Sequence, residues 1–140
     1  MPASIDVFYL ARKVQGWDLI QQFAASYFRH DAGIDHELVI LAKGFEKRTE
    51  RYLLSELFNI PLDNVIYVEE EIGQDIHSYK YGSGLRKAEY ACFLNSYSQI
   101  EAEGWLRYLH DAISQDDIGL AGATGSFESL YNSYALIDAV

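Results

Sequence analysis

Cysteine is nearly absent from this 140-residue sequence, which contains only Cys92. One cysteine cannot form an intramolecular disulfide, so the fold must be stable without one, as expected in a reducing compartment. Cys92 lies in an apolar run, and we interpret it as a small buried residue and not as a nucleophile. The sequence also lacks a basic, apolar leader and any run of about 20 apolar residues that could span a membrane. We therefore expect a cytoplasmic protein with no membrane span.

Lysine and arginine are scarce, at 11 residues against 21 aspartates and glutamates, which gives a formal net charge of -10. A surface of this sign repels the phosphates of nucleic acids and of anionic lipids, so we expect no nucleic-acid partner. A small anionic ligand remains compatible with the composition. Local backbone N–H groups and one or two cations are enough to override the global charge at a binding site.

Several motifs of common enzymes are missing as well. The sequence has no P-loop, no Gly-x-Gly-x-x-Gly after its first apolar run and no Gly-x-Ser-x-Gly elbow, which argues against dinucleotide enzymes and α/β-hydrolases. The histidines have no metal-ligand spacing. They are His30, His36, His77 and His110. His77 is nearest to the predicted site, and we interpret it as a surface or capping residue.

What the sequence does contain is a regular alternation of two patterns. Short apolar runs, typical of strands covered on both faces, occur at Ile5–Leu10, Leu38–Ala42, Val65–Val68, Tyr90–Leu94 and Ile118–Ala121. Helical periodicity occurs between them, at Leu19–Phe28, Leu53–Phe58, Gln74–Lys87 and Trp105–Ile113. The alternation predicts one α/β domain over residues 1–140, with a mainly parallel sheet of about five strands and helices on both faces.

The ends of the predicted helices are less regular than their centres. Pro61 should stop the second helix. Gly82-Ser83-Gly84 should interrupt the third. Ser98 and Glu101 have capping-box spacing ahead of the fourth. The aromatic tail after Gly125 is compatible with a further helix packed on the sheet or with an unfinished element.

Ligands of an open parallel sheet bind outside the carboxyl ends of its strands. The segments expected there are Ala11-Arg12-Lys13, Lys43-Gly44-Phe45, Glu69–Glu71, Asn95-Ser96-Tyr97 and Gly122–Ser126. Arg12 and Lys43 could bind a phosphate, although solvated loop charges are the commoner state. The acidic run with Asp75 could bind a cation, but a solvated acidic loop is again commoner. Gly122–Ser126 is small enough for a backbone–ligand approach, and a simple turn is its commoner role.

One part of the chain goes beyond generic patterning. The stretch Gly84–Ser98, followed by Gly104-Trp105-Leu106 and Ile118–Gly122, resembles the centre of a GT-A glycosyltransferase of the family 2 type. That family has a segment ending in Phe-Leu-x-x-Asp before a Trp-Leu helix. Val7–Arg12 and Leu38–Ala42 fall where its first two strands would lie. The resemblance is sharpest from Gly84 to Gly122 and implies a Rossmann-like GT-A nucleotide-sugar-binding half.

The resemblance implies a nucleotide-diphosphate sugar as ligand. The residues that it assigns to donor binding are Ala11, Arg12, Lys43, Asp75, Asn95, Ser96 and Tyr97. Where the family carries a metal-binding Asp-x-Asp, this chain has Asn95-Ser96-Tyr97, so binding of Mg²⁺ or Mn²⁺ is left open. Lys43 follows the second strand, where the family has an acidic residue. Transfer would invert the anomeric centre, with a catalytic base that the sequence does not identify.

Three alternatives stay open at this point. The first is a glycosyltransferase. Because the family's catalytic base lies downstream of the part matched by Gly122, we expect this chain to be only the nucleotide-binding half of such an enzyme. A non-catalytic module is the second reading. It would act in assembly or regulation of polysaccharide synthesis, with its exposed apolar remainder covered in a homo-oligomer or by a partner chain. A flavodoxin-like receiver is the third, and Ala11-Arg12-Lys13 lacks the paired acids that it needs.

Overall fold

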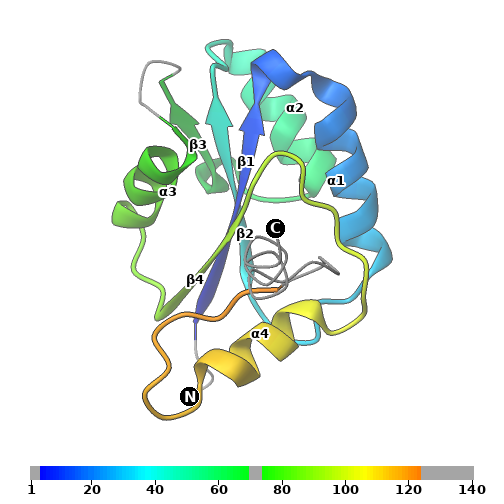
Figure 1. Ribbon diagram of the computed structural model, residues 1–140. Coiled ribbons are helices and arrows are strands. Elements are labelled where there is room, and N and C mark those ends of the chain that lie inside the picture. The colour runs from blue at the N-terminus through cyan, green and yellow to red at the C-terminus, as the bar shows by residue number, and fades with distance from the viewer. Residues whose placement is uncertain (1–3, 70–73, 124–140) are drawn as a thin grey trace, which may run out of the picture. The chain divides into compact units, whose positions relative to one another are not determined.

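The computed structural model describes residues 4–69 and 74–123. Its strands are β1 (Ile5–Arg12), β2 (Glu37–Lys43), β3 (Val65–Val68) and β4 (Tyr90–Leu94). Its α-helices are α1 (Trp17–Arg29), α2 (Arg48–Phe58), α3 (Asp75–Gly84) and α4 (Trp105–Ile113), and short 3-10 helices cover Lys13–Gln15 and Leu62–Asn64. The chain divides into two compact units after Trp105. The first contains the sheet and α1 to α3, and nearly all of α4 belongs to the second (Figure 1).

Within residues 4–69 and 74–123, the sheet has four parallel strands in the order β3-β2-β1-β4. This confirms the prediction of an α/β fold with a parallel sheet. The predicted fifth strand is wrong, because Ile118–Ala121 has no regular secondary structure. Glycines within and just after this run weaken its strand propensity, and Leu120 is 88% exposed. The prediction of one domain stays a prediction.

Helices cover both faces of the sheet, as predicted, with α1 and α2 on one face and α3 on the other (Figure 1). On the first face, the ring of Tyr9 stacks on Phe23 of α1, with centroids 3.8 Å apart, and lies 6.1 Å from Phe58 of α2. On the second face, strands β1, β2 and β3 form an apolar cluster against which Tyr79 of α3 packs. Its buried members are Phe8, Leu10, Val39, Leu41 and Val68.

Helix α3 passes through the glycines that were expected to interrupt it. Gly82 is fully within the helix, and a Cβ atom at this position would lie 2.4 Å from Cδ2 of Leu41. The missing side chain therefore lets α3 approach β2 closely. The predicted capping box is also wrong, since α4 begins only at Trp105 and the Ser98 hydroxyl donates to Oδ1 of Asn95 at 3.1 Å. Each described helix is too short or too polar to cross a lipid bilayer.

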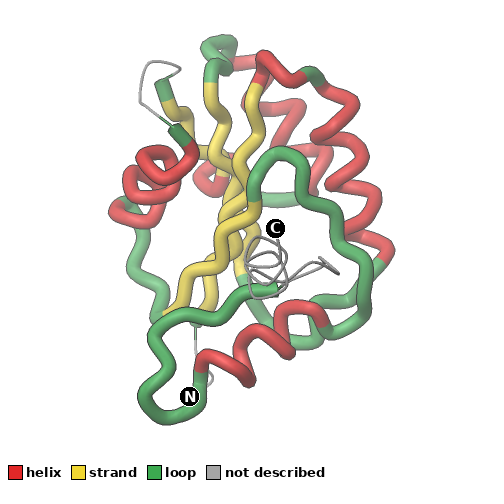
Figure 2. The backbone as a smooth tube through the Cα atoms, viewed as in Figure 1, coloured by secondary structure: helices red, strands yellow, loops and turns green. Residues whose placement is uncertain are grey.

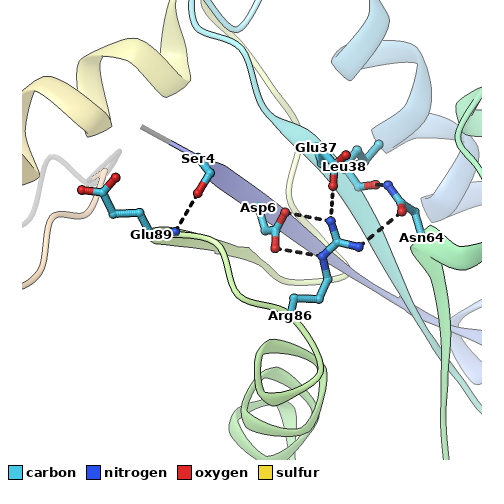
Figure 3. Close-up of polar contacts among 7 residues, drawn as sticks. All are labelled: Ser4, Asp6, Glu37, Leu38, Asn64, Arg86 and Glu89. Carbon is cyan, nitrogen blue, oxygen red and sulfur yellow. Dashed lines mark hydrogen bonds and ion pairs between the residues drawn. The ribbon is translucent and has the colours of Figure 1, made fainter. Parts of the chain in front are cut away.

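The amino end of the sheet is held by one arginine (Figure 3). Asp6 of β1 and Glu37 of β2 are in register, and Arg86 reaches both from the segment after α3. Its Nε and Nη2 donate to the two carboxylate oxygens of Asp6 at 2.8 and 3.0 Å, and Nη1 donates to Oδ1 of Asn64 at 3.3 Å. The hydrogen bonds to Asp6 raise the pKa of Arg86, against the effect of desolvation. Asn64 in turn donates to the carbonyl of Leu38 at 3.0 Å.

Candidate functional site at the carboxyl end of the sheet

The strand order reverses between β1 and β4. From β1 the chain moves outward to β2 and β3, and it then returns to place β4 on the opposite side of β1. Open α/β sheets bind their ligands beside the loops that follow the two strands on either side of such a reversal. In Figure 2, the loop after β4 begins beside the carboxyl end of β1.

Two buried hydrogen bonds fix the loop after β4 to β1. The hydroxyl of Tyr9 donates to the carbonyl of Ser96 at 3.0 Å, and the hydroxyl of Ser96 donates to the carbonyl of Leu10 at 2.8 Å. Burial raises the pKa of Tyr9 well above its ordinary range, so this hydroxyl remains a donor at all physiological pH values. Ser96, which the sequence assigned to ligand binding, is itself buried and anchors the loop.

The neighbours of Ser96 are exposed. Tyr97 is 66% exposed, and its hydroxyl accepts a hydrogen bond from Nε2 of Gln15 at 3.3 Å. This bond joins the loop after β4 to the 3-10 turn after β1. Asn95 is exposed, but its Oδ1 accepts from the backbone N–H of Tyr97 at 3.0 Å and from the hydroxyl of Ser98 at 3.1 Å. The side-chain oxygen of Asn95 therefore stabilises the conformation of its own loop.

Two cations end the neighbouring strands β1 and β2. Both strands are longer than the sequence predicted, so Arg12 and Lys43 lie within them and are partners in register. The solvated state expected for Lys43 is wrong, because this residue is only 2% exposed. Ala11 is fully buried in β1. The register therefore places two positive charges side by side at this end of the sheet.

An ion pair joins the segments that follow β1 and β2. Nζ of Lys13 lies 2.8 Å from Oε1 of Glu50 in the first turn of α2. Glu50 also accepts from the backbone N–H of Lys47 at 3.3 Å. The Lys13 hydrogen bond is the main cause that lowers the pKa of Glu50. Nearby, the rings of Trp17 and Phe45 meet edge to face with centroids 5.5 Å apart. These contacts hold the base of the site in place.

The remaining predicted site segments are only partly described. Asp75 is partly buried and begins α3. Glu69 is exposed, whereas the rest of the acidic run lies outside the described residues. Gly122 lies in the second unit without regular secondary structure, and residues 124–140, with the aromatic tail, lie outside the described part.

His30 and His36 lie at the turn between α1 and β2, whereas the exposed His77 lies in the first turn of α3. Both ring nitrogens of His36 are hydrogen-bonded, to the Tyr27 hydroxyl at 2.7 Å and to the carbonyl of Ile34 at 2.9 Å. His30 contacts the carbonyl of Ser26 at 3.1 Å. Two open, shallow hollows surround residues 27–36 at the turn between α1 and β2. Since their histidines already have backbone or hydroxyl partners, we assign these hollows a structural role.

Metal-binding side chains are dispersed in the described part of the chain. Within residues 4–69 and 74–123, no three His, Cys, Asp or Glu side chains are grouped closely enough to hold a metal ion. In comparisons with known proteins, no protein-family model matches the chain, and no curated protein matches it significantly.

Proposed function

We propose that this chain is a glycosyltransferase-like domain that binds a nucleotide-diphosphate sugar at the carboxyl end of its sheet. One observation carries the proposal. The strand order reverses between β1 and β4, and hydrogen bonds join the loops that flank the reversal. Nucleotide-binding halves of Rossmann-like sheets have this strand order and bind their ligands at this position. The stretch that resembles GT-A glycosyltransferases, Gly84–Gly122, contains β4 and its loop.

The distribution of charge supports a ligand with a diphosphate. The chain has 11 basic residues and a net charge of -10, yet five of the 11 end β1 and β2 or lie in the segments leading into the next helices. These five are Arg12, Lys13, Lys43, Lys47 and Arg48. Glu46 and Glu50 lie in the same segments, and Glu50 pairs with Lys13, so five cations against two acids leave a smaller local excess of positive charge, which still favours an anionic ligand over the global repulsion.

A non-catalytic module is the second candidate, and the loop after β4 favours it. The Asn95 oxygen that could replace a metal-binding aspartate already accepts two hydrogen bonds within its own loop. Binding of the donor should then depend little on Mg²⁺ or Mn²⁺. An incubation of donor and protein with a panel of saccharide acceptors separates the two candidates, because transfer forms a bond from the sugar to an acceptor hydroxyl (or to water in slow hydrolysis) and releases the nucleoside diphosphate, whereas a binding module leaves the donor intact.

Calorimetry tests the proposed ligand class. The full chain is titrated with UDP-, GDP- and dTDP-sugars, with and without Mn²⁺, after circular dichroism has shown that it is folded. We expect saturable binding of at least one donor, with affinity that falls as salt rises because charge is being neutralised. If a folded sample binds none of these donors, the proposal is wrong.

A substitution of Arg12 tests its location. Arg12→Gln should weaken donor binding about tenfold, the effect of losing about 1.4 kcal/mol of charge-assisted hydrogen bonding. Arg29→Gln makes the same change on an exposed residue in the last turn of α1 and is the matched control. We expect it to alter affinity by less than about threefold. Equal effects of the two variants would contradict a site centred on β1 and β2.

A further inference from the structure

Among the residues that the structure describes, strand β4 forms one edge of the sheet. It pairs with β1 alone in the described part of the chain, where it is the last strand of the sheet. The backbone N–H of Tyr90 donates to the carbonyl of Ser4 on the β1 side. Because backbone groups alternate in direction along a strand, those of Cys92 and Leu94 also point to β1, and those of Ala91 and Phe93 point to the open edge.

The two edges of the sheet differ in their protection. At the β3 edge, Pro61 and the fully exposed Asp63 precede a four-residue strand, and the guanidinium of Arg51 lies 5.9 Å from the ring of Tyr67. Prolines, charges and short length are devices that keep edge strands from pairing with another chain. Strand β4, Tyr90–Leu94, contains no charged residue and no proline; like β3 it is preceded by an exposed acid, Glu89, but not by a proline. Its edge therefore has the properties of a strand that pairs with another strand.

Apolar side chains continue the open edge onto α3. Ala91 is exposed and Phe93 is 43% exposed, although the Phe93 ring packs on Tyr79 with centroids 4.8 Å apart. Ile76, which shares the helix face of Tyr79, is 77% exposed. Contiguous exposed apolar residues beside an unpaired strand are typical of an interaction surface.

We propose that a second copy of this chain pairs with β4, antiparallel and related by a two-fold axis that passes beside Cys92. The strand is self-complementary about this residue. Ala91 of one copy pairs with Phe93 of the other. Both are apolar residues whose backbone groups point to the open edge, and each pair places a small side chain beside a large one. The contact is isologous and closes, which is how most homodimers form. The proposal is independent of the proposed ligand, since the edge of β4 is separate from the carboxyl-end loops.

The symmetry makes a specific statement about Cys92. In the proposed register, the two Cys92 residues face each other as a non-hydrogen-bonded pair, with Cα atoms about 4.5 Å apart. This separation falls within the range of about 4.4–6.8 Å that a disulfide bridges. Burial raises the pKa of the thiol to about 11, so coupling should be slow at neutral pH and faster in alkali.

Light scattering coupled to size exclusion is the first test. We expect the full chain to show twice its monomer mass of 15.9 kDa at high protein concentration. Since each copy carries a charge of -10, association should strengthen as salt screens the repulsion. A folded protein that remains monomeric at every concentration and salt would overturn the proposal. It would show either that a segment of the same chain covers this edge or that no strand pairs with it.

Oxidation with copper phenanthroline in mild alkali is the second test. Two Cys92 thiols should give one disulfide, with two protons released and two electrons passed to Cu²⁺, and a covalent dimer in the wild type. Ala91→Lys keeps Cys92 but places a charge at the paired edge, and it should reduce both the cross-link and dimer affinity at least about tenfold. Ala102→Lys is the matched control in an exposed loop, and Cys92→Ala is the control for specificity. A cross-link that Ala91→Lys leaves unchanged in a folded sample would overturn the register.

Discussion

The two ends of the β1–β2 strand pair carry opposite charges. At the amino end the pair places two acids in register, Asp6 and Glu37, and at the carboxyl end it places two cations, Arg12 and Lys43. Between them lies the apolar cluster of the α3 face. The acids are bridged by Arg86, which hydrogen-bonds to both. The cations end strands whose carboxyl end lies beside the loop after β4, where Asn95 and Tyr97 are exposed.

The difference separates stability from binding. A buried charge network whose donors and acceptors are satisfied by the chain itself contributes when the chain folds, and its loss leaves uncompensated charge. Under the proposed function, Arg12 and Lys43 would contribute in addition when an anion binds. Substitutions at the amino end should therefore change stability more than affinity. Those at the carboxyl end should lower affinity more than stability.

The largest effect should come from breaking the amino end. Arg86→Ala leaves the Asp6 carboxylate, only 6% exposed, without its cation and should lower the free energy of unfolding by about 3 kcal/mol. Urea denaturation measures this. Lys87→Ala truncates the exposed neighbouring cation and should change stability by less than about 0.5 kcal/mol. The comparison fails if Arg86→Ala leaves stability intact but weakens donor binding.

Local sequence patterns were sufficient to predict the elements of this fold. The four apolar runs that form β1 to β4 and the helical faces of α1, α2 and α4 lie close to the predicted ranges. The exceptions have local causes that pattern alone misjudges. Ile118–Ala121 is apolar enough for a strand but is broken by glycine, whereas Gly82 is tolerated in a helix because Leu41 occupies the space of its side chain.

The segments of the candidate site were expected at the carboxyl end of the sheet, but the contacts among them were not. The rule that the carboxyl ends of parallel strands meet at one edge of the sheet correctly predicted that the segments after β1 and β4 lie together. It could not reveal that Tyr9 anchors Ser96 from 87 residues away, or that Arg86 reaches Asp6 across 80 residues. Such partners depend on strand order and register, which no local periodicity contains. The role of Glu50 was missed for the same reason.

An intermediate effect should follow from loosening the carboxyl end. Tyr9→Phe removes the hydrogen bond to the carbonyl of Ser96 and should cost about 1 kcal/mol of stability. Donor affinity should also fall several-fold, because the loop after β4 loses an anchor. Tyr27→Phe removes a similar hydroxyl bond, to His36 near the amino end of β2, and should cost similar stability without loss of affinity. Parallel losses of affinity in both variants would remove the distinction between the two ends.

The smallest effect should come from the charge of Glu50, which holds the segments after β1 and β2 together through Lys13. The folded-state pKa of Glu50 is lowered, so its contribution is present above the ordinary glutamate value of about 4.3 and is lost as pH falls through the lower folded value. Glu50→Gln keeps an acceptor oxygen for the N–H of Lys47 but removes the charge. At neutral pH it should lower stability by at most about 0.5 kcal/mol, since Lys13 is partly exposed.

Urea titrations of the wild type and of Glu50→Gln at neutral and acidic pH measure this difference. We expect the two unfolding curves to converge as the pH falls below 4 (about the ordinary pKa of the free side chain), and also to converge at high salt. Glu56→Gln makes the same change on the exposed surface of α2 and should alter stability less at neutral pH. A difference that grows in acid would mean that the Lys13–Glu50 pair does not stabilise the folded protein, and the carboxyl end would then be held by its hydrogen bonds and apolar contacts alone.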